Sequence, residues 1–488
     1  MAREAAIFGE CIGNVVWPVQ TEIVLNWDIE ADLVVVGGGG AGLTAAGTAA
    51  KVGRELDVVL LEKNPNEPCN TEIASNFVPA AGTRFQRAAG VDDSAEVFVE
   101  DILKKNAGKG HAAVIAEIGR LSPEAIHWLV DAFGVEIEYA PELTWVGHTN
   151  RRLHARPSRS GPPIVSRLRQ HVKEQSNVRI LDYTTATGLV RDKGVVVGVE
   201  AERDNKRLRI AAGRVALTTG GFSANRQMLA ANIPEMADAP NIGSKADNGD
   251  GIRWGQEAGA MVSLMSGYQG RDCIFEDGTR VTPPVLNEGG IAVNAHGLRF
   301  INERHDYSAL ARIYRAQPRG FAYFIWDMRI QRMVKNVFVM QQAMERGGIV
   351  RGDTIEQIAT AFDLPAAVLS DTITNYNDGV RQGTDAFGRE ALTQPLEPPW
   401  YAARITGAIA HTQGGLAVDT ACRVLREDQT PVPGLYAGGN TMAGLSGDEP
   451  GGYLSGNGLL VAYVTGMIIG RHAVRSIREE HTRRLESS

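Results

Sequence analysis

The sequence predicts an α/β fold in which a parallel-sheet domain, built from two separate segments of chain, carries an inserted α+β cap domain. Three observations predict it. A glycine-rich turn near residue 40 lies between a Val-rich run and an Ala-rich helix, and glycine-dense, strand-like sequence returns after residue 414. The stretch between them is richer in Arg, Pro and aromatic residues. We expect the first segment at 1–262, the cap at 263–404 and the second segment at 405–488.

The composition excludes several classes of protein. Of 488 residues, 43% are hydrophobic, which excludes a disordered chain. The formal charge of −7 argues against nucleic acid or an anionic membrane as a partner. The four cysteines lie far apart and form no CxxC, so we expect no disulfide framework and no metal site. Because neither a secretory signal nor a membrane-spanning run is visible, we expect a soluble cytoplasmic protein.

The first predicted element is a strand at Asp32–Val36, a Val-rich run typical of a strand buried in a parallel sheet. We expect residues 1–30 ahead of it to be irregular. Glycines follow the strand, and then a helix at Leu43–Lys51 whose small residues allow close packing. A second apolar run at Leu56–Leu61 completes a β-α-β unit with a tight first turn.

The next segments change from helical to strand periodicity. Helical periodicity is present at Ala95–Ala107, Pro123–Phe133 and Val165–Glu174. Short alternating runs then predict a small antiparallel meander that returns to the main sheet. These runs are Arg179–Tyr183, Gly188–Arg191, Val195–Glu202, Arg207–Ala212 and Val215–Thr218.

The glycine-rich turn has the spacing of a dinucleotide-binding fingerprint. Gly37–Gly42 satisfies GxGxxG, and Glu62 lies 20 residues after its last glycine. Gly37 makes the turn, Gly39 lets the backbone approach a pyrophosphate, and Gly42 lets helix and strand pack closely. The helix N-terminus supplies N–H groups to phosphates, and Glu62 accepts hydrogen bonds from ribose hydroxyls. The pattern therefore predicts a Rossmann-like domain.

The rest of the glycine pattern favours FAD as the dinucleotide. The sequence contains no second GxGxxG, so a separate NAD(P)H domain is not expected. The strand at Pro433–Asn440 ends in glycines, and Gly456–Leu460 opens the last helix, whose N–H groups can face the flavin O2 region. Six glycines lie in 37–47 and eleven in 434–470, so 17 of the 55 lie where backbone would press on a dinucleotide.

These segments together resemble the fumarate reductase/3-ketosteroid dehydrogenase flavoprotein family. The markers are WDIEADLVVVGGGGAG, LEKNP, TTGGF, KADNGDGIRWG, RFINE, HTQGGLAVD, PGLYAGGN and GGYLSGNG, in the family's order. The resemblance implies an FAD-binding domain in two pieces, an inserted cap and a substrate between the cap and the isoalloxazine. It also implies hydride exchange between flavin N5 and a carbon β to an electron-withdrawing group.

The motifs and the resemblance together give a set of candidate cofactor residues. These are Gly37, Gly39, Gly40, Ala41, Gly42, Glu62, Lys63, Asn70, Thr71, Gly82, Thr219, Gly220, Asp250, Gly439, Asn440, Gly456, Gly458, Leu459 and Leu460. Succinate dehydrogenases carry a flavin-linking His where this chain reads Cys69-Asn70-Thr71, so we expect FAD to be bound non-covalently.

The sequence departs from the fumarate reductases at the substrate. They read R-L-G-G-N where this chain has Tyr453-Leu454-Ser455-Gly456-Asn457, so Tyr453 stands in place of the Arg that holds a carboxylate. A tyrosine cannot replace the bidentate grip of a guanidinium. Tyr-x-Ser followed by Gly looks instead like the Δ4(5α)-type 3-ketosteroid dehydrogenases. That resemblance implies that Tyr453 exchanges the α-proton, Ser455 relays it and Tyr307 assists.

Each of these residues has a plainer alternative. Tyr453 is otherwise a packing aromatic, and Ser455 an ordinary N-cap. Tyr314, Tyr323 and Tyr376 compete with Tyr307 for the cap tyrosine.

Other candidates follow from the chemistry of a carbonyl substrate. His411, where fumarate reductases place a substrate-binding His, can donate to a carbonyl or a carboxylate, or can simply hold the domain joint. Arg304, Arg312 and Arg329 are candidates for the proton-donating Arg of the family. A tyrosine has an ordinary pKa near 10, so it serves as a base only if a neighbouring Ser and a helix N-terminus stabilise the phenolate.

The sequence predicts an FAD-dependent oxidoreductase that interconverts a saturated ketone, either a 3-ketosteroid or a smaller cyclic ketone, and its α,β-unsaturated form. Its electron acceptor or donor is unidentified. The first alternative is an ene-reductase of an α,β-unsaturated carboxylic acid that uses His411 and the cap arginines. The second alternative is a flavin-binding electron carrier without a substrate pocket.

Overall fold

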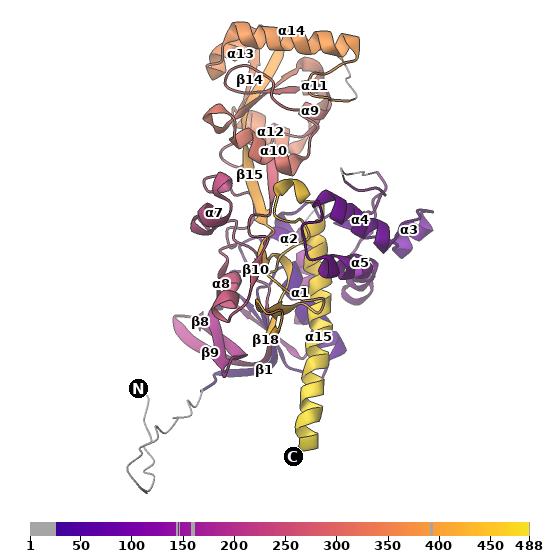
Figure 1. Cartoon of the computed structure of the whole chain (residues 1–488), viewed down its shortest axis with the longest axis vertical. Helices are drawn as coiled ribbons and strands as arrows, with labels where there is room; N and C mark the ends of the chain where they lie inside the picture. Colours follow the sequence, from indigo (N-terminus) through magenta and orange to yellow (C-terminus); the bar gives the residue numbers. More distant parts are fainter. Residues whose placement is uncertain (1–25, 143–144, 146, 158–161, 391–393, 488) are drawn as a thin grey trace.

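The computed structural model describes residues 26–142, 145, 147–157, 162–390 and 394–487. The region expected to be irregular, 1–30, lies mostly outside them. Figure 1 shows an elongated molecule with a lower body that contains both ends of the described chain and an upper lobe made by the middle of the sequence. The strand β15 (Trp400–Thr412) runs from the upper lobe into the lower body.

The lower body is built on a sheet with strand order β17-β18-β9-β1-β2-β6, and β7 and β8 extend from β9. The pairs β18–β9, β9–β1, β1–β2 and β2–β6 are parallel. The strands are β1 (Ile29–Val36), β2 (Val58–Glu62), β6 (Val178–Asp182), β7 (Thr185–Asp192), β8 (Val195–Arg203), β9 (Lys206–Leu217), β17 (Arg423–Leu425) and β18 (Pro431–Ala437). The two segments of chain thus share one sheet, since β18 comes from the second.

Two helices with small residues at their contact cover this sheet. Helix α1 (Gly40–Val52) follows β1, and the long helix α15 (Asn457–Ser487) packs along it (Figure 1). A Cβ on Gly466 would lie 2.5 Å from the Ala41 carbonyl oxygen, so only glycine permits this approach. The Ala-rich sequence of α1 predicts close packing, and the partner in that packing is α15.

The secondary structure differs from the sequence expectation in three respects. The run Arg179–Tyr183 is not part of the meander, because β6 pairs in parallel with β2 inside the main sheet. The last two predicted runs form one strand, β9, so the antiparallel meander is β7-β8-β9. Helix α5 (Ala112–Phe133) starts a full eleven residues before Pro123, since its buried apolar stripe continues across the proline. The predicted helix begins at Pro123 because proline is favoured in the first turn of a helix. The predicted start was therefore too late in the chain.

The upper lobe has a sheet and a hydrophobic core of its own. Its strand order is β11-β15-β13-β12, with β14 also paired to β15. The strands are β11 (Tyr268–Ile274), β12 (Ile291–Val293), β13 (Ala322–Asp327) and β14 (Ile349–Gly352), with β15. The helices are α9 (Pro284–Asn287), α10 (Tyr307–Arg315), α11 (Met328–Val334), α12 (Phe338–Glu345), α13 (Ile355–Phe362) and α14 (Ala366–Gln382), with η2 (Pro318–Gly320). The cap limits of 263 and 404 stay a prediction.

The remaining elements connect the two bodies or cover the lower one. The strands are β3 (Val78–Pro79), β4 (Glu138–Tyr139), β5 (Leu153–Ala155), β10 (Val262–Ser263) and β16 (Gly415–Leu416). The helices are α2 (Asn70–Ile73), α3 (Arg84–Ala88), α4 (Ala95–Lys105), α6 (Pro162–Lys173), α7 (Arg226–Asn232), α8 (Asp250–Glu257), η1 (Pro234–Met236), η3 (Gly439–Thr441) and η4 (Pro450–Gly452).

Candidate functional site

The pocket that contains most of the predicted site residues, called the main pocket below, lies where the glycine-rich turn, the end of β15, the strand β11 and the start of α15 meet. Its wall comes from both ends of the chain and from the upper lobe. Predicted cofactor residues on this wall are Gly37, Gly39, Gly40, Ala41, Glu62, Lys63, Asn70, Thr71, Thr219, Gly220, Asp250, Gly439, Asn440, Gly456, Gly458 and Leu459. Gly42, Gly82 and Leu460 do not line it.

The three residues off the wall have structural reasons for their positions. A Cβ on Gly42 would lie 1.8 Å from the Gly37 carbonyl oxygen, so this glycine serves the contact of helix and turn. Leu460 is fully buried in the core of the lower body. Gly82 takes a left-handed φ of 72° beside the Asp93 carbonyl and belongs to a loop away from the pocket.

The glycine-rich turn has the form of a dinucleotide cradle. Gly37 adopts a φ of 106°, and a Cβ there would lie 2.4 Å from the Thr218 carbonyl oxygen. The N-cap residue of α1, Gly39, has no side chain to cap the helix, so N–H groups of its first turn other than that of Gly40, which Thr71 accepts, are available to a phosphate. The Glu62 carboxylate accepts a hydrogen bond from the Gly38 N–H at 2.8 Å. The turn thus combines backbone without side chains, a helix start without a side-chain cap and an acid at the end of β2. This combination fits a dinucleotide such as FAD.

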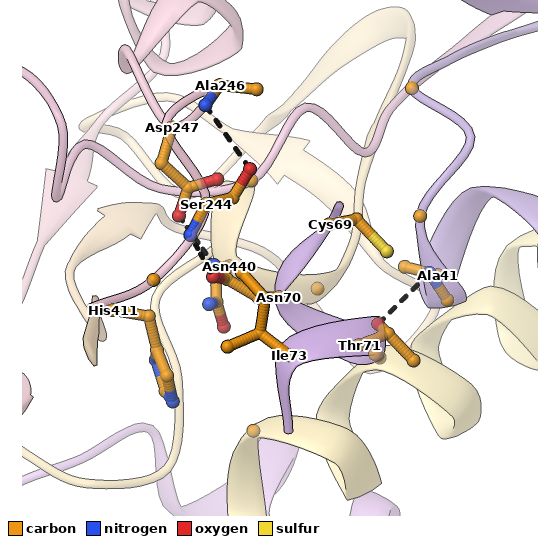
Figure 2. Close-up of a pocket in the computed structure, with 18 of the residues that line it drawn as sticks. Ala41, Cys69, Asn70, Thr71, Ile73, Ser244, Ala246, Asp247, His411 and Asn440 are labelled. Carbon is orange, nitrogen blue, oxygen red and sulfur yellow. Dashed lines mark hydrogen bonds between the residues drawn. The ribbon is translucent and has the colours of Figure 1, made fainter. Parts of the chain in front are cut away.

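A second polar group closes the pocket opposite the turn (Figure 2). The Asn70 amide donates to the Asp247 carboxylate at 2.6 Å and accepts from the Ser244 N–H at 2.7 Å. Burial raises the pKa of Asp247 to about 6, against the hydrogen bond from Asn70 and the charge of Lys63. This arrangement fixes the short helix α2, from which Thr71 accepts the Gly40 N–H at 3.2 Å.

The predicted catalytic residues meet at the other end of the pocket. The Tyr307 hydroxyl lies 3.0 Å from Ser455 Oγ and accepts a hydrogen bond from the Gln269 amide at 3.3 Å. The Tyr453 oxygen accepts from the Gly458 N–H at 3.4 Å. The Ser455 hydroxyl, expected beside Tyr453, faces Tyr307 across the two lobes, and its part as a proton relay stays a prediction. Gly458, near the start of α15, supports Tyr453 instead.

The alternatives for the cap tyrosine are resolved by burial. Tyr314, Tyr323 and Tyr376 lie in the hydrophobic core of the upper lobe, whereas Tyr307 lines the pocket. Burial raises the pKa of Tyr307, against the nearby charge of Arg271 and the hydrogen bond from Ser455. Burial also raises the pKa of Tyr453, and a charge on Tyr307 would raise it further. Both phenols are therefore held neutral, not ionised, in this structure.

His411 lies beside Tyr453 in an edge-to-face contact, with 5.5 Å between ring centroids. Burial lowers the pKa of His411 to about 4, so the ring is neutral near pH 7. The Gln413 amide nitrogen lies 3.1 Å from its Nδ1. The Gln413 contact favours Nδ1 as acceptor with the N–H on Nε2, which faces Gly458, whereas the Thr412 carbonyl oxygen, 3.3 Å from Nδ1, favours the N–H on Nδ1. In the tautomer with the N–H on Nε2, His411 can donate a hydrogen bond into the pocket.

The arginines that line the pocket are different from those expected. Arg304, Arg312 and Arg329 do not contribute to its wall; Arg312 pairs with Glu449 on the surface, and Arg329 contacts Asp327. Arg271 and Arg280 line it instead. The Arg271 guanidinium carbon lies 4.6 Å from the centre of the Tyr307 ring.

Sequence reasoning missed these arginines because it did not assign β11. Residues two apart on a strand face the same side, so the strand at Tyr268–Ile274 would have placed Gln269 and Arg271 together. The register sets Gln269 opposite His411 on β15. Phe77 and Trp145, which form an aromatic part of the wall with ring centroids 5.5 Å apart, carry no local signal.

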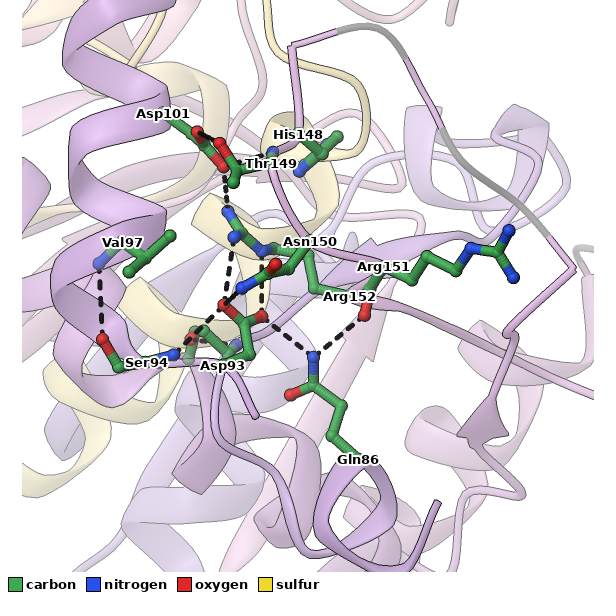
Figure 3. A network of polar contacts seen from close by, with 12 residues as sticks. Gln86, Asp93, Ser94, Val97, Asp101, His148, Thr149, Asn150, Arg151 and Arg152 are labelled. Atoms are coloured by element: carbon green, nitrogen blue, oxygen red, sulfur yellow. Dashed lines mark hydrogen bonds and ion pairs between the residues drawn. The ribbon is translucent and has the colours of Figure 1, made fainter. Parts of the chain in front are cut away.

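Helix α4 connects the reacting end of the pocket to the lower body. Lys105, at its end, forms a mostly buried ion pair with Asp306 at 2.6 Å, directly before Tyr307. Asp101 accepts hydrogen bonds from the Thr149 N–H at 2.8 Å and from Arg152 at 2.6 Å (Figure 3). The ring of His148, the residue directly before Thr149, donates a hydrogen bond to the Ser455 carbonyl at 3.1 Å. One helix therefore positions both partners of the Tyr307–Ser455 contact.

Comparison with known proteins agrees with this geometry. Residues 32–459 match the family described as FAD binding domain. The chain belongs to that family. A relative, the probable fumarate reductase Ifc3 of Shewanella frigidimarina, is 30% identical over 464 residues, which are 94% of this chain and 77% of the relative.

Two solved structures are similar over nearly the whole chain. The open conformation of a flavocytochrome c3 fumarate reductase gives a TM-score of 0.80 at 29% identity, and covers 92% of this chain and 79% of its own. The 3-ketosteroid-Δ4-(5α)-dehydrogenase of Rhodococcus jostii RHA1 gives 0.76 at 25% identity, with coverage of 93% and 98%.

The protein is an FAD-dependent oxidoreductase of the fumarate reductase/3-ketosteroid dehydrogenase family that acts on a small molecule. Its fold and cofactor are those predicted from the sequence. Among the helices that the structure describes, we find none with both the length and the apolar character needed to cross a membrane.

Proposed function

We propose that this flavoprotein interconverts a saturated ketone and its α,β-unsaturated form. The observation that carries the proposal is that Tyr307 and Tyr453 line one pocket, with the buried Ser455 hydroxyl 3.0 Å from that of Tyr307. Hydroxyl groups suit a carbonyl oxygen, and the position of the fumarate reductase arginine is taken by Tyr453. The dehydrogenase of Rhodococcus jostii RHA1, whose structure was solved in complex with 4-androstene-3,17-dione, supports this assignment because its fold matches over nearly its whole length.

FAD, when bound, supplies hydride exchange with the β-carbon of the substrate. Tyr453 holds the proton that the α-carbon exchanges, and the Gly458 N–H fixes its oxygen. The neutral His411 donates its Nε2 N–H to the carbonyl oxygen, which polarises the bond between the α- and β-carbons. Tyr307 and Ser455 form a hydroxyl relay through which a proton reaches or leaves this end of the pocket. A neutral, buried phenol is a proton donor, so we propose that the reductive direction is favoured.

Reduction of an α,β-unsaturated carboxylic acid is the second candidate. The relative named as a probable fumarate reductase favours it, and His411 can donate to a carboxylate oxygen as well as to a ketone. The two candidates differ in the compound that exchanges electrons with the flavin. The cytoplasmic location stays a prediction. So does the exchange of electrons with a donor or acceptor whose identity the sequence does not give.

An anaerobic titration of the bound flavin tests the proposal. The dithionite-reduced holoenzyme is mixed with cyclic enones or with unsaturated acids that lack a ketone, and reoxidation is followed by absorbance. We expect enones to reoxidise the flavin and Tyr453→Phe to slow this by roughly 100-fold or more with FAD content unchanged. Equal rates in the variant would contradict the role of Tyr453, and reoxidation by acids alone would select the second candidate.

A further inference from the structure

We infer that Arg271 and Arg280 form an anion-binding site for a carboxylate that the substrate carries in addition to its ketone. The inference rests on the proposed function and names the substrate class of the same pocket. It makes the substrate an oxo acid, neither a neutral steroid ketone nor a simple unsaturated acid. The two arginines are specificity-determining residues in this view.

The first step of the argument is the position of the two side chains. Both line the main pocket and both are partly buried. They lie on the two arms of one turn, since Ile274 on β11 forms a bridge with Arg280. Burial lowers the pKa of Arg280, and the nearby charge of Arg271 lowers it further, so the two guanidinium groups are close enough to repel each other.

The second step is the missing counter-charge. Within the described part of the chain, neither Arg271 nor Arg280 forms an ion pair or a hydrogen bond to a carboxylate. Burial raises the pKa of Asp272, the next residue along β11, and the nearby charge of Arg271 acts against that rise, although the two side chains form no ion pair. A guanidinium cannot lose its proton in a protein, so two partly buried cations with one unpaired carboxyl near Arg271 and none paired to Arg280 carry a cost that is only partly compensated. A bound carboxylate reduces that cost.

The third step concerns which residues of the pocket match which group of the substrate. Tyr307 and Tyr453 offer hydroxyl groups and His411 a neutral N–H on the pocket wall, which match a ketone oxygen and a carbon acid. The planar guanidinium of Arg271 matches a carboxylate, with which it can form two parallel hydrogen bonds. Because the Arg271 guanidinium stacks on Tyr307, the anion site adjoins the hydroxyl relay. A compact molecule that bears both groups can therefore reach both sets of residues.

Three matched probes test the inference on the holoenzyme. They are a cyclohexenone that carries a carboxylate, the methyl ester of the same compound, and cyclohexene carboxylate, which has no ketone. The dissociation constant of each is measured from the perturbation of the oxidised flavin spectrum, and reoxidation of the reduced flavin is measured separately. We expect the oxo acid to bind roughly 10- to 100-fold more tightly than its ester.

Two variants and a control separate anion binding from structural support. Arg271→Gln and Arg280→Gln should each weaken the oxo acid by roughly tenfold or more and change the ester by less than about twofold. Arg332→Gln, an exposed arginine on α11 of the same lobe, should change neither. A fall in ester and oxo acid binding alike would show that Arg271 merely supports Tyr307, and would overturn the inference.

The probes also distinguish failure of the inference from failure of the proposed function. If the ester and the oxo acid bind and react equally, the pocket has no anion site, and the ketone chemistry still holds. If cyclohexene carboxylate reoxidises the flavin and neither ketone does, the proposed function fails, and the arginines bind the carboxylate of an unsaturated acid. Tighter binding of the oxo acid that both arginine variants abolish supports the inference.

Discussion

The hydroxyl groups of Tyr307 and Ser455 lie 3.0 Å apart although 148 residues separate them in the chain. Tyr307 begins α10 in the upper lobe, and Ser455 lies just ahead of α15 in the lower body. The contact therefore exists only when the two lobes are held together at this point. Lys105 holds one side through Asp306, and His148 holds the other through the Ser455 carbonyl.

If Tyr307 and Ser455 act as one relay, their removal should not be additive. We expect Tyr307→Phe and Ser455→Ala each to lower the rate of flavin reoxidation by roughly 10- to 100-fold. The rate of flavin reoxidation in the double variant should be no lower than that of the slower single variant. The reason is that either substitution alone already interrupts the relay. Single-turnover rates with one enone measure this coupling, and multiplied single effects would contradict a shared relay.

The ion pair between Lys105 and Asp306 should matter for catalysis without contact to the substrate. Lys105→Met leaves the Asp306 carboxylate mostly buried without its partner, which costs roughly 1–3 kcal/mol of lobe docking. We expect slower flavin reoxidation with the FAD content retained. Lys104→Met, on the exposed side of the same helix, is the matched control and should behave as the unchanged protein. Equal rates in both variants would exclude a role for the ion pair.

Glu62 should contribute to cofactor affinity rather than to chemistry. Its carboxylate accepts hydrogen bonds from the N–H groups of Gly38 and Asn64, and its position at the end of β2 faces the ribose of a dinucleotide. Glu62→Gln should weaken FAD binding by roughly 10-fold, the effect of one charge-assisted hydrogen bond. Fluorescence of released FAD measures it. The control is Glu55→Gln, an exposed acid that pairs with Arg478 on α15.

The buried carboxyl of Asp247 predicts a pH dependence of stability. Its pKa is about 6 in the folded chain and near 3.9 in an unfolded one. Between these values the folded chain binds more protons at this site, so stability falls as the pH rises through the folded pKa. The loss starts near pH 4, is complete above about pH 7 and amounts to roughly 3 kcal/mol at most.

Asp247→Asn tests that dependence because an amide oxygen can still accept from Asn70. We expect the Tm difference between variant and unchanged holoenzyme to move in favour of the variant as the pH is raised from about 4 to about 7. Asp204→Asn, at an exposed turn, should show no such trend. A constant difference across this range would mean that Asp247 does not titrate there.

Much of the cofactor end could be predicted from the sequence because its signals are local. The fingerprint at Gly37–Gly42, the acid Glu62 and the glycines after β18 are short stretches in which backbone geometry demands a particular residue. Gly42 is an example. The motif predicts that it lets helix and strand pack closely, and a Cβ there would meet the Gly37 carbonyl oxygen.

The reacting end was predicted less completely because its residues come from distant segments. Tyr307, Tyr453 and His411 were identified one at a time, from motifs. Which hydroxyl group Ser455 faces has no local signal in the sequence, and the structure places Ser455 against Tyr307. The cap arginines were also misassigned, since exposure and pocket contact depend on how β11 and α10 pack.

By itself, the sequence determined the fold class, the dinucleotide and the kind of chemistry, because each rests on spacing within a few residues or on motifs in a fixed order. Only the tertiary structure decided which side chains share the reacting end of the pocket. The packing of the upper lobe against α4 and α15 places Ser455 against Tyr307 and brings Arg271 and Arg280 together. Hydrogen bonds and charges act over a few ångströms. The separation of these residues along the chain does not show that they lie this close together in the folded protein.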